Sequence, residues 1–382
     1  MYLDRLTWQP GVGWVGLPAT RHGAAVAILY FGPRDWLSDG DRHRELCAAF
    51  PDAIVLGCST GGQIAGAQLR DDIIAAVAIT FEHTRLRYAT EDLTGAASSH
   101  DCGERLGRRL AAPDLAGILL LSDGLDVNGS ALADGMGTGI GRAVPILGGL
   151  AADGARFQET LVAAGEHAPR TGRAVALGFY GDSLRIGSGS CGGWDRFGPP
   201  RRITAAQGNV LRELDGASAL ALYERYLGDE ASGLPGSALL FPLRIWDPAD
   251  PGSRVVRTVL SVDREAGTMT FAGDMPQGWR AELLHGSFER LVDGAEEAAA
   301  EAVGAHSDAP LLALLVSCIG RRLLMGQRVQ DEVDAAVRTL PQGSVPIGFY
   351  SYGEFAPQRA AGRPRLHNQT MTVATLAEVR PC

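Results

Sequence analysis

Short, continuous apolar runs that end in glycine-rich or polar loops recur along the first half of the chain. They lie at 53–56, 73–81, 117–121 and 144–147. Apolar runs of this length, bounded by turn residues, are typical of buried strands. Helical patterns separate some of them, for example at 42–50 and 102–111. The alternation of strands with helices predicts a layered α/β fold.

The second half continues this alternation after a loop-like segment at 194–200. The expected elements are a helix at 215–227, strands at 238–245, 255–262 and 280–284, and a helix at 287–303. At 382 residues the chain exceeds the length at which one hydrophobic core usually stops growing. We therefore predict two domains, 1–214 and 215–382.

The ends of the two halves resemble each other. Val144-Pro145-Ile146 and Val345-Pro346-Ile347 each begin a strand that runs into a loop with an acid, which is Asp153 in the first half and Glu354 in the second. The similar offset indicates a duplicated α/β module. The predicted fold class is therefore α/β, with two related domains built on mixed sheets.

Composition changes this picture mainly by excluding partners. Hydrophobic residues make up 46% of the chain, charged residues 21%, and the net charge is −9. An acidic balance works against nucleic-acid binding, which needs a basic stripe. No apolar run approaches the roughly 20 residues of a membrane span, and the first residues lack a signal-peptide pattern. We expect a cytoplasmic protein that binds neither nucleic acid nor a membrane.

The residue types that carry covalent and metal chemistry are sparse or scattered. The sequence has no lysine, so all 35 basic residues are arginine, which excludes Schiff-base catalysis and a P-loop. Six cysteines form no CxxC pair, and eight histidines show no HxxxH or HExxH spacing. These absences argue against a zinc site and a disulfide framework. No metal and no cofactor is expected, except that spacing cannot reveal a lone axial haem ligand.

Gly57-Cys58-Ser59-Thr60-Gly61 matches the G-x-S-x-G pattern of a nucleophile elbow, and a strand precedes it. An elbow also needs a helix directly after the serine. Gly61-Gly62 and the residues that follow are poor helix formers. We therefore favour a turn that presents Ser59, Thr60 and backbone N–H groups to a ligand, with serine hydrolysis as the alternative.

The densest polar and aromatic cluster is Gly348-Phe349-Tyr350-Ser351-Tyr352-Gly353-Glu354-Phe355. On a single strand, alternation sends Tyr350, Tyr352 and Glu354 to one face. Two phenols and a carboxylate there suit a small polar or cationic ligand. An edge strand whose tyrosines cap a core is the other interpretation.

Two further candidates lie in the second half. Cys318 follows a buried-type strand and precedes a helix with Arg321 and Arg322, a setting that lowers a thiol pKa. A structural buried cysteine is the alternative. His367-Asn368-Gln369-Thr370 is a polar run that enters a strand, and His367 is the histidine to test as a haem ligand.

Taken together, these segments resemble the FIST family. The N-terminal resemblance lies in Gly57–Gly62, Ser122-Asp123-Gly124 and Gly148–Asp153. The C-terminal one lies in Phe241-Pro242-Leu243, Ser317–Arg321, Gly348–Glu354 and His367–Thr370. The resemblance implies tandem FIST N-terminal and C-terminal domains that act as a sensory input unit. It also implies small ligands such as amino acids, or haem with a response to nitric oxide.

The primary hypothesis is a non-enzymatic, small-ligand-binding sensory protein that relays ligand occupancy to a separate signalling protein. The expected ligand-binding residues are Ser59, Thr60, Asp153, Cys318, Arg321, Tyr350, Tyr352, Glu354, His367 and Asn368. Their loops are expected to converge on one cavity between the two halves. The alternatives are a haem-binding nitric-oxide sensor, a serine hydrolase that uses Ser59, and an adaptor without a small ligand.

Overall fold

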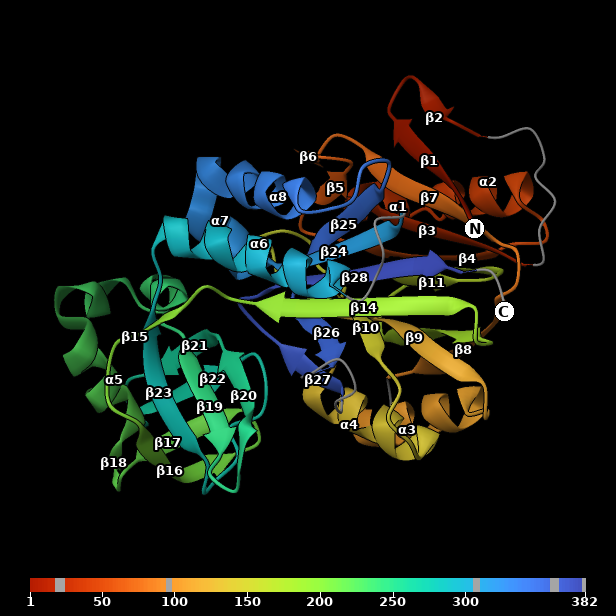
Figure 1. The fold of residues 1–382 in the computed structure, drawn as a ribbon. Helices are drawn as coiled ribbons and strands as arrows, with labels where there is room; N and C mark the ends of the chain where they lie inside the picture. Colours follow the sequence, from red (N-terminus) through yellow and green to blue (C-terminus); the bar gives the residue numbers. More distant parts are fainter. Residues whose placement is uncertain (18–24, 94–97, 305–309, 358–363, 380–382) are drawn as a thin grey trace.

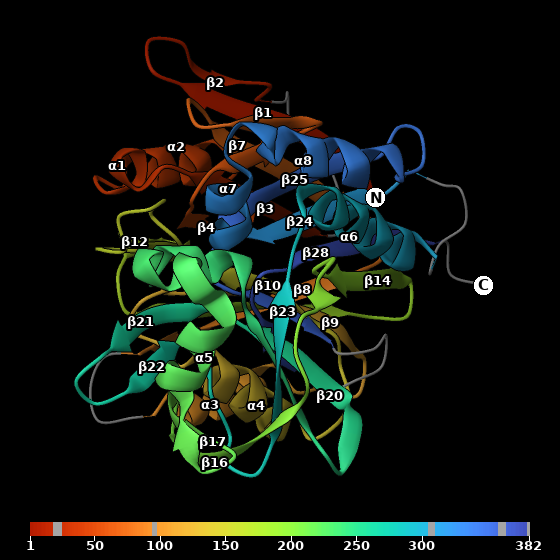
Figure 2. The same cartoon turned by 90° about the vertical axis from the view of Figure 1, so that its left-hand side faces the viewer.

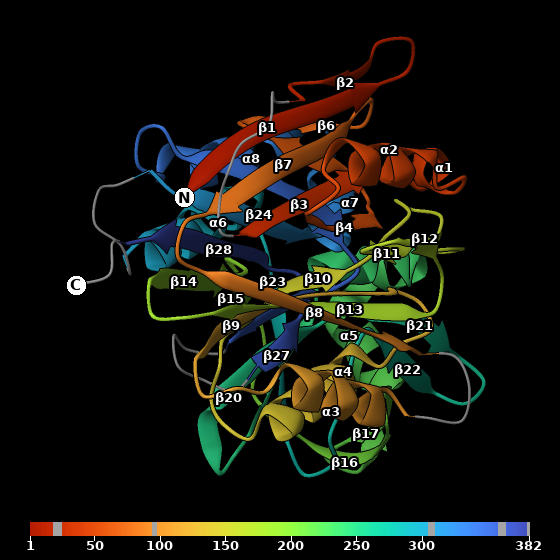
Figure 3. The same ribbon diagram turned by 90° about the vertical axis from the view of Figure 1, so that its right-hand side faces the viewer.

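Three mixed sheets enclose a common apolar core, and a fourth sheet forms a separate unit at one end (Figure 1). The computed structural model describes residues 1–17, 25–93, 98–304, 310–357 and 364–379. Helices cover the outer faces of the three mixed sheets, and Figure 3 shows helices α2 and α3 on the side away from the fourth sheet. The predicted α/β class with mixed sheets is confirmed.

The first sheet has the strand order β12-β11-β4-β3-β7-β1-β2. Its strands are β1 (Tyr2–Gln9), β2 (Gly13–Val15), β3 (Ala25–Gly32), β4 (Ile54–Ser59), β7 (Ile74–Phe81), β11 (Val162–Ala164) and β12 (His167–Arg170). Strands β3 and β4 are parallel, and the helices α1 (Arg34–Leu37) and α2 (Asp41–Ala49) connect them.

The second sheet has the order β27-β26-β10-β9-β13-β8. Its strands are β8 (Arg85–Asp92), β9 (Leu115–Ser122), β10 (Ile146–Leu150), β13 (Arg173–Tyr180), β26 (Glu354–Pro357) and β27 (Pro364–His367). Strands β9 and β10 are parallel, and helix α4 (Gly129–Ile140) connects them. Helix α3 (Ser99–Leu110) precedes β9 and lies against α4.

The third sheet has the order β14-β28-β24-β25-β5-β6. Its strands are β5 (Gln63–Ala65), β6 (Gln68–Arg70), β14 (Leu184–Cys191), β24 (Leu312–Cys318), β25 (Val345–Ser351) and β28 (Met371–Glu378). Strands β24 and β25 are parallel, and α7 (Ile319–Met325), η3 (Gly326–Arg328) and α8 (Val329–Arg338) connect them. Helix α6 (Phe288–Val303) lies across β14 and β28.

The three sheets share one topology, so the predicted duplication is a triplication. Each has a parallel pair, an antiparallel strand beside the first member of that pair, and a short hairpin beside the second. The hairpin follows the parallel pair of one sheet in sequence but extends another sheet. Thus β5–β6 follows β4 and joins β25, β11–β12 follows β10 and joins β4, and β26–β27 follows β25 and joins β10. This cyclic exchange interlocks the three repeats.

The central strands of the three sheets are apolar on both faces, because side chains that alternate along each strand pack into two different cores. In β24, Leu312, Leu314 and Val316 point into the core shared by the three sheets. Ala313 and Leu315 pack under the covering helices. A strand buried on both faces has no polar side, so it reads as a continuous apolar run.

Close helix packing explains the glycines of β14. A Cβ on Gly187 would lie 1.9 Å from the carbonyl oxygen of Ala302, and one on Gly189 would lie 2.1 Å from that of Ala298. Helix α6 can therefore approach the strand only because both positions lack a side chain. Any larger residue there would push α6 off the third sheet.

Residues 195–285 form the inserted unit, whose helix α5 and strands are seen in Figure 2. The unit has its own core around Ile203, Tyr223 and Phe271. Its strands are β15 (Asp195–Arg196), β16 (Arg201–Gln207), β17 (Val210–Leu214), β18 (Ala217–Ser218), β19 (Leu243–Asp247), β20 (Asp250–Arg257), β21 (Val259–Asp263), β22 (Thr268–Phe271) and β23 (Arg280–His285). Its helices are α5 (Ala219–Leu227), η1 (Gly228–Gly233) and η2 (Gly236–Leu240). The predicted division at 214/215 falls in the turn between β17 and β18, and strands from both sides of it share sheets.

Several local predictions need correction. The strand expected at 238–245 begins only at Leu243, because residues 236–240 form η2. The single strand expected across Gly348–Phe355 ends at Ser351, and a bend separates it from β26. In the described part of the chain, no helix combines the length and apolar character that a membrane crossing requires.

Candidate functional site

A cavity of about 710 Å³ lies between the inserted unit and the strand-ending loops of the second and third sheets. The second sheet contributes segment 124–129 and Leu150, and the third contributes segment 318–320. The inserted unit closes the other side with segments 258–260 and 271–274. Cavities of this size suit ligands of drug-like dimensions. We call this space the central cavity.

An aromatic pair forms one wall of the central cavity. The ring of Phe157 stacks on that of Tyr352 with centroids 4.5 Å apart and planes 9° apart. Phe157 has a positive φ of 51° and is 46% exposed, an unfavourable backbone conformation for a bulky residue. Backbone strain of this kind persists only where neighbouring contacts hold it, and the stack on Tyr352 is one such contact.

Asp153 fixes that aromatic wall from behind. Its carboxylate accepts hydrogen bonds from the Tyr352 hydroxyl and from the backbone N–H groups of Phe157, Gln158 and Glu159. Burial alone would raise the pKa of Asp153, but these hydrogen bonds lower it below its ordinary value. The Tyr352 hydroxyl also contacts the carbonyl oxygen of Gly154 at 2.9 Å. Asp153 thus supports the cavity without lining it.

Two polar side chains in the wall have buried atoms without hydrogen-bond partners among the described residues, Asn368 through its amide and Thr258 through its hydroxyl. The side chain of Asn368 is completely buried, and neither Nδ2 nor Oδ1 has a hydrogen-bond partner among the described residues. Burying an amide without partners costs about 1–3 kcal/mol. The other two asparagines in the wall are satisfied, because Asn209 donates to the carbonyl oxygen of Phe271 and Asn128 donates to Asp274.

Cys318 lines the cavity but does not have the reactive character that its position before a helix predicts. It is 3% exposed, and burial raises its thiol pKa well above the ordinary value. Arg321 lowers that pKa only slightly by comparison. The thiol is therefore buried, and its pKa shift is opposite to the one that the position before a helix predicts.

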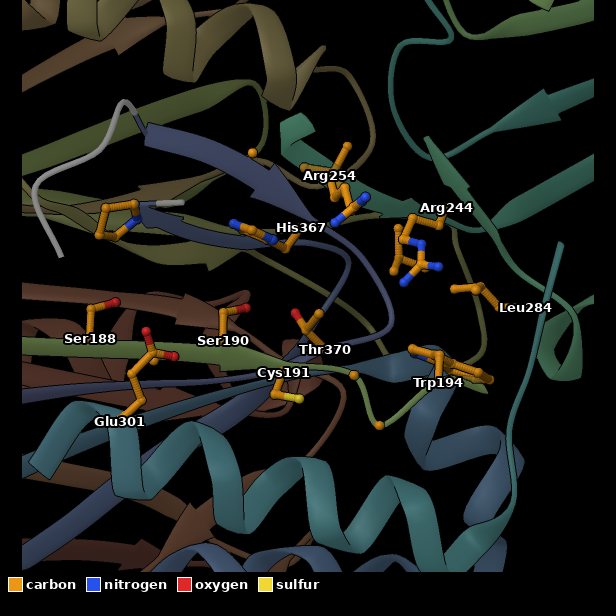
Figure 4. A pocket seen from close by; sticks show the side chains of 17 residues that line it. Ser188, Ser190, Cys191, Trp194, Arg244, Arg254, Leu284, Glu301, His367 and Thr370 are labelled. Atoms are coloured by element: carbon orange, nitrogen blue, oxygen red, sulfur yellow. The ribbon is translucent and has the colours of Figure 1, made fainter. Parts of the chain in front are cut away.

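A second, polar pocket of about 290 Å³ is lined in part by His367 and Thr370, which flank Asn368 in the sequence (Figure 4). Arg244 and Arg254 project into it from β19 and β20, and His367 projects from the end of β27. His367 is 8% exposed, and its Nε2 has no hydrogen-bond partner in the described structure. Burial, followed by the charge of Arg257, lowers the pKa of His367 to about 4, so its ring is neutral at pH 7.

The structure therefore brings only some of the predicted residues to a cavity. Cys318, Tyr352 and Asn368 line the central cavity, and His367 lines the polar pocket. The remaining predicted residues lie outside both walls: Ser59, Thr60, Asp153, Arg321, Tyr350 and Glu354. The loops after β4, β10 and β25 do converge, but they pack against one another with these side chains buried.

Ser59 illustrates that packing. Its Oγ accepts a hydrogen bond from the N–H of Leu161 at 2.9 Å, and its carbonyl oxygen accepts one from Ala152. Thr60 donates its hydroxyl to the carbonyl of Gly32. Residues 60–62 run directly into β5, so no helix follows the serine as an elbow requires. In the described residues, no histidine hydrogen-bonds to Ser59.

Arg321 and Tyr350 belong to a buried network around Glu332. Arg321 donates to Glu332 through Nε at 2.8 Å and Nη2 at 2.6 Å, and to the carbonyl oxygens of Gly192 and Leu291. The Tyr350 hydroxyl donates to Glu332 at 2.6 Å. The side chains of Arg321, Glu332 and Tyr350 are buried and line neither pocket, so this network joins α6, α7, α8 and β25.

Glu354 is close enough to Cys318 to influence its thiol, and its side chain is also fully buried. It accepts hydrogen bonds from the hydroxyls of Ser351 at 2.7 Å and Thr370 at 2.8 Å. Burial raises its pKa to about 8 despite these hydrogen bonds. The bend at residues 352–353 separates Glu354 from Tyr352, which explains why the predicted common face does not form.

The residues that sequence reasoning missed come mainly from the inserted unit. Thr258, Phe271 and Asp274 complete the central cavity, together with Phe157 on the opposite wall. Their sequence context carries no motif, since they reach the cavity only through the packing of the unit on the strand-ending loops. The backbone strain at Phe157 has no sequence signature either.

The fold and the central cavity define an α/β protein with a partly open cavity between two structural parts. Family models match two consecutive stretches, the FIST N domain over residues 25–217 and the FIST C domain over residues 219–357. The chain belongs to the FIST family, whose domains are sensory domains of signal transduction rather than catalytic ones. No curated protein matches the chain.

Proposed function

We propose that this protein senses a small ligand in the central cavity and passes the occupancy of that cavity to a separate signalling protein. The observation that carries the proposal is the cavity itself, about 710 Å³ in volume and walled by both structural parts. A concave, mostly apolar space with a few polar groups is the usual form of a small-molecule site. Its walls belong to both the FIST N and the FIST C stretch.

The contacts across the cavity supply a route from ligand to output. Asn128, the N-cap residue of α4, donates to Asp274 of the inserted unit at 2.8 Å. Arg257 of the same unit donates to the carbonyl of Leu366 at 3.0 Å and to Ser130 at 3.2 Å. A ligand between these contacts binds best to one placement of the inserted unit. It thereby shifts the population toward that placement, which a partner protein can read.

The test is a thermal-shift and native mass spectrometry screen of neutral, cationic and anionic small molecules against a cavity-filling variant. A Cβ on Gly236 meets no atom within 4 Å, so Gly236→Leu extends into open space at the cavity wall. Gly304→Leu, on the exposed end of α6, is the matched control. We expect hits that bind wild type and Gly304→Leu but not Gly236→Leu. Hits that bind all three equally would contradict the proposal.

The expected amino acid-like ligand is better accommodated in the polar pocket than in the central cavity. Among the described residues of the central cavity wall, Asp274 is the one acid and none is arginine or histidine. A carboxylate bound there would lack a counter-charge, and an unpaired buried charge is strongly unfavourable. Competition experiments with an amino acid and a neutral hit distinguish the two locations.

Haem binding through His367 is the second candidate, favoured by the unpartnered Nε2 of its neutral ring. The size of the pocket argues against it. Pockets for drug-sized ligands span about 300–1,000 Å³, and a porphyrin needs more than the lower limit, whereas His367 faces about 290 Å³. A Soret band after expression with added haem, lost in His367→Ala, would support the haem sensor.

A further inference from the structure

The amide of Asn368 points to the chemistry of the ligand. It is the fully buried polar side chain in the wall of the central cavity, and both its donor and its acceptor lack a partner among the described residues. Buried amides in folded proteins are nearly always hydrogen-bonded, so an exception calls for an explanation. A ligand in the cavity that completes both hydrogen bonds provides one.

An asparagine amide presents its N–H and its C=O on one edge. The complementary group must therefore offer an acceptor and a donor side by side. A primary amide does so, and a lactam does so because its ring holds the amide cis. A trans secondary amide carries its N–H and C=O on opposite sides and can form one of the two hydrogen bonds at a time.

The remaining wall excludes a charged anion and favours an apolar body. Tyr352 has already committed its hydroxyl to Asp153 and Gly154, so it offers the cavity mainly its ring. Phe157, Phe271 and Leu150 add further apolar surface. Without an arginine or histidine among the described wall residues, a carboxylate or phosphate would remain unpaired.

We propose that the central cavity binds a neutral molecule that pairs the edge of a primary amide or lactam with Asn368 and lays an apolar or aromatic body against Phe157 and Tyr352. This proposal rests on the proposed function, because it names the ligand class of the same cavity.

The test compares five small aromatic probes by ligand-observed NMR titration of the full-length protein. Benzamide carries the primary amide, and isoindolinone carries the lactam. N-Methylbenzamide has the same groups in trans, methyl benzoate lacks the donor, and toluene lacks both. We expect benzamide, isoindolinone or both to bind at least about tenfold more tightly than the last three, as one additional buried hydrogen bond allows.

Two variants assign that preference to one residue. Asn368→Leu keeps the size of the side chain and removes both orphan groups, so we expect the tenfold preference to disappear while toluene still binds. Asn209→Leu is the matched control, because Asn209 lines the same cavity but already donates to Phe271. In that variant the preference for benzamide or isoindolinone should persist.

The outcomes separate the two proposals. If all five probes bind equally well to wild type and none binds to Gly236→Leu, the amide class is wrong but the central cavity is still a ligand-binding site. A preference that survives in Asn368→Leu would also overturn it. If no probe binds to wild type at millimolar concentration, the proposed function itself fails. A preference shown by benzamide alone, or by isoindolinone alone, identifies which form of the amide edge the cavity accepts.

Discussion

The buried ion pair between Arg321 and Glu332 allows a prediction about stability. Whether a variant is more or less stable should depend on the buried charge that it leaves unpaired, and not on how many contacts it removes. Both side chains are 0% exposed. Glu332→Gln keeps the shape of the side chain and an oxygen that can accept from Tyr350 and Ser317. It removes the negative charge that compensates the guanidinium of Arg321 and replaces Oε2, which accepts from Arg321 Nε and Nη2, with an NH2 group that cannot accept. The other acceptors of Arg321 are backbone carbonyls.

The expected loss of stability is large because the uncompensated charge has no route to solvent. Breaking a buried ion pair by removing one partner costs about 3–5 kcal/mol. The double variant Arg321→Met/Glu332→Gln leaves no buried charge. Its remaining defects are unpaired carbonyl oxygens and the NH2 group of the new amide, and uncharged groups of this kind are less costly to bury than a charge. We therefore expect the double variant to be more stable than Glu332→Gln alone.

Urea denaturation followed by fluorescence and circular dichroism measures these differences as changes in the free energy of unfolding. The control is Glu289→Gln, which breaks the exposed pair with Arg328 at 2.9 Å and should cost less than about 1 kcal/mol. A loss below about 1 kcal/mol for Glu332→Gln would refute the reasoning. So would a double variant less stable than the single one.

Three further predictions concern other buried groups. Burial raises the pKa of Glu354 from 4.5 to about 8, so folding favours its protonated form. Its contribution to stability is therefore present below about pH 4.5 and is lost as the pH rises to about 8. Glu354→Gln should remove that decline in stability between pH 5 and pH 8, and an unchanged pH profile would contradict the assignment. Cys318 should resist iodoacetamide at pH 8 in the folded protein, because burial keeps its thiol protonated; mass spectrometry showing rapid alkylation would count against this. Ser59→Ala should lower the free energy of unfolding by about 1–3 kcal/mol, because the buried N–H of Leu161 loses its acceptor. The wild-type protein should not react with a fluorophosphonate probe. Labelling of wild type that is lost in Ser59→Ala would support the hydrolase alternative.

Local patterns predicted the repeated strands well and the site only in part. The runs at 73–81 and 117–121 correspond to β7 and β9, because strands buried on both faces need continuous apolar sequence. The sequence predicts Cys318 from its place between a strand and a helix, Tyr352 from a polar and aromatic segment, and Asn368 from a polar run that enters a strand. Local patterns of the same kind predict Ser59, Arg321 and Glu354, which the structure buries in hydrogen-bonded networks.

The sequence by itself determined the layered α/β class, the absence of lysine chemistry and the strand-ending loops that approach one another, because apolar period and residue type act locally. Tertiary structure alone decided that there are three repeats, because each interlocking hairpin pairs with a strand that lies more than a hundred residues away in the sequence. It also decided where the cavity lies. The inserted unit packs over the strand-ending loops and leaves the central cavity beside them. No local pattern encodes this packing of one core on another, and it decides that Asn368 lines the cavity while other predicted polar residues do not.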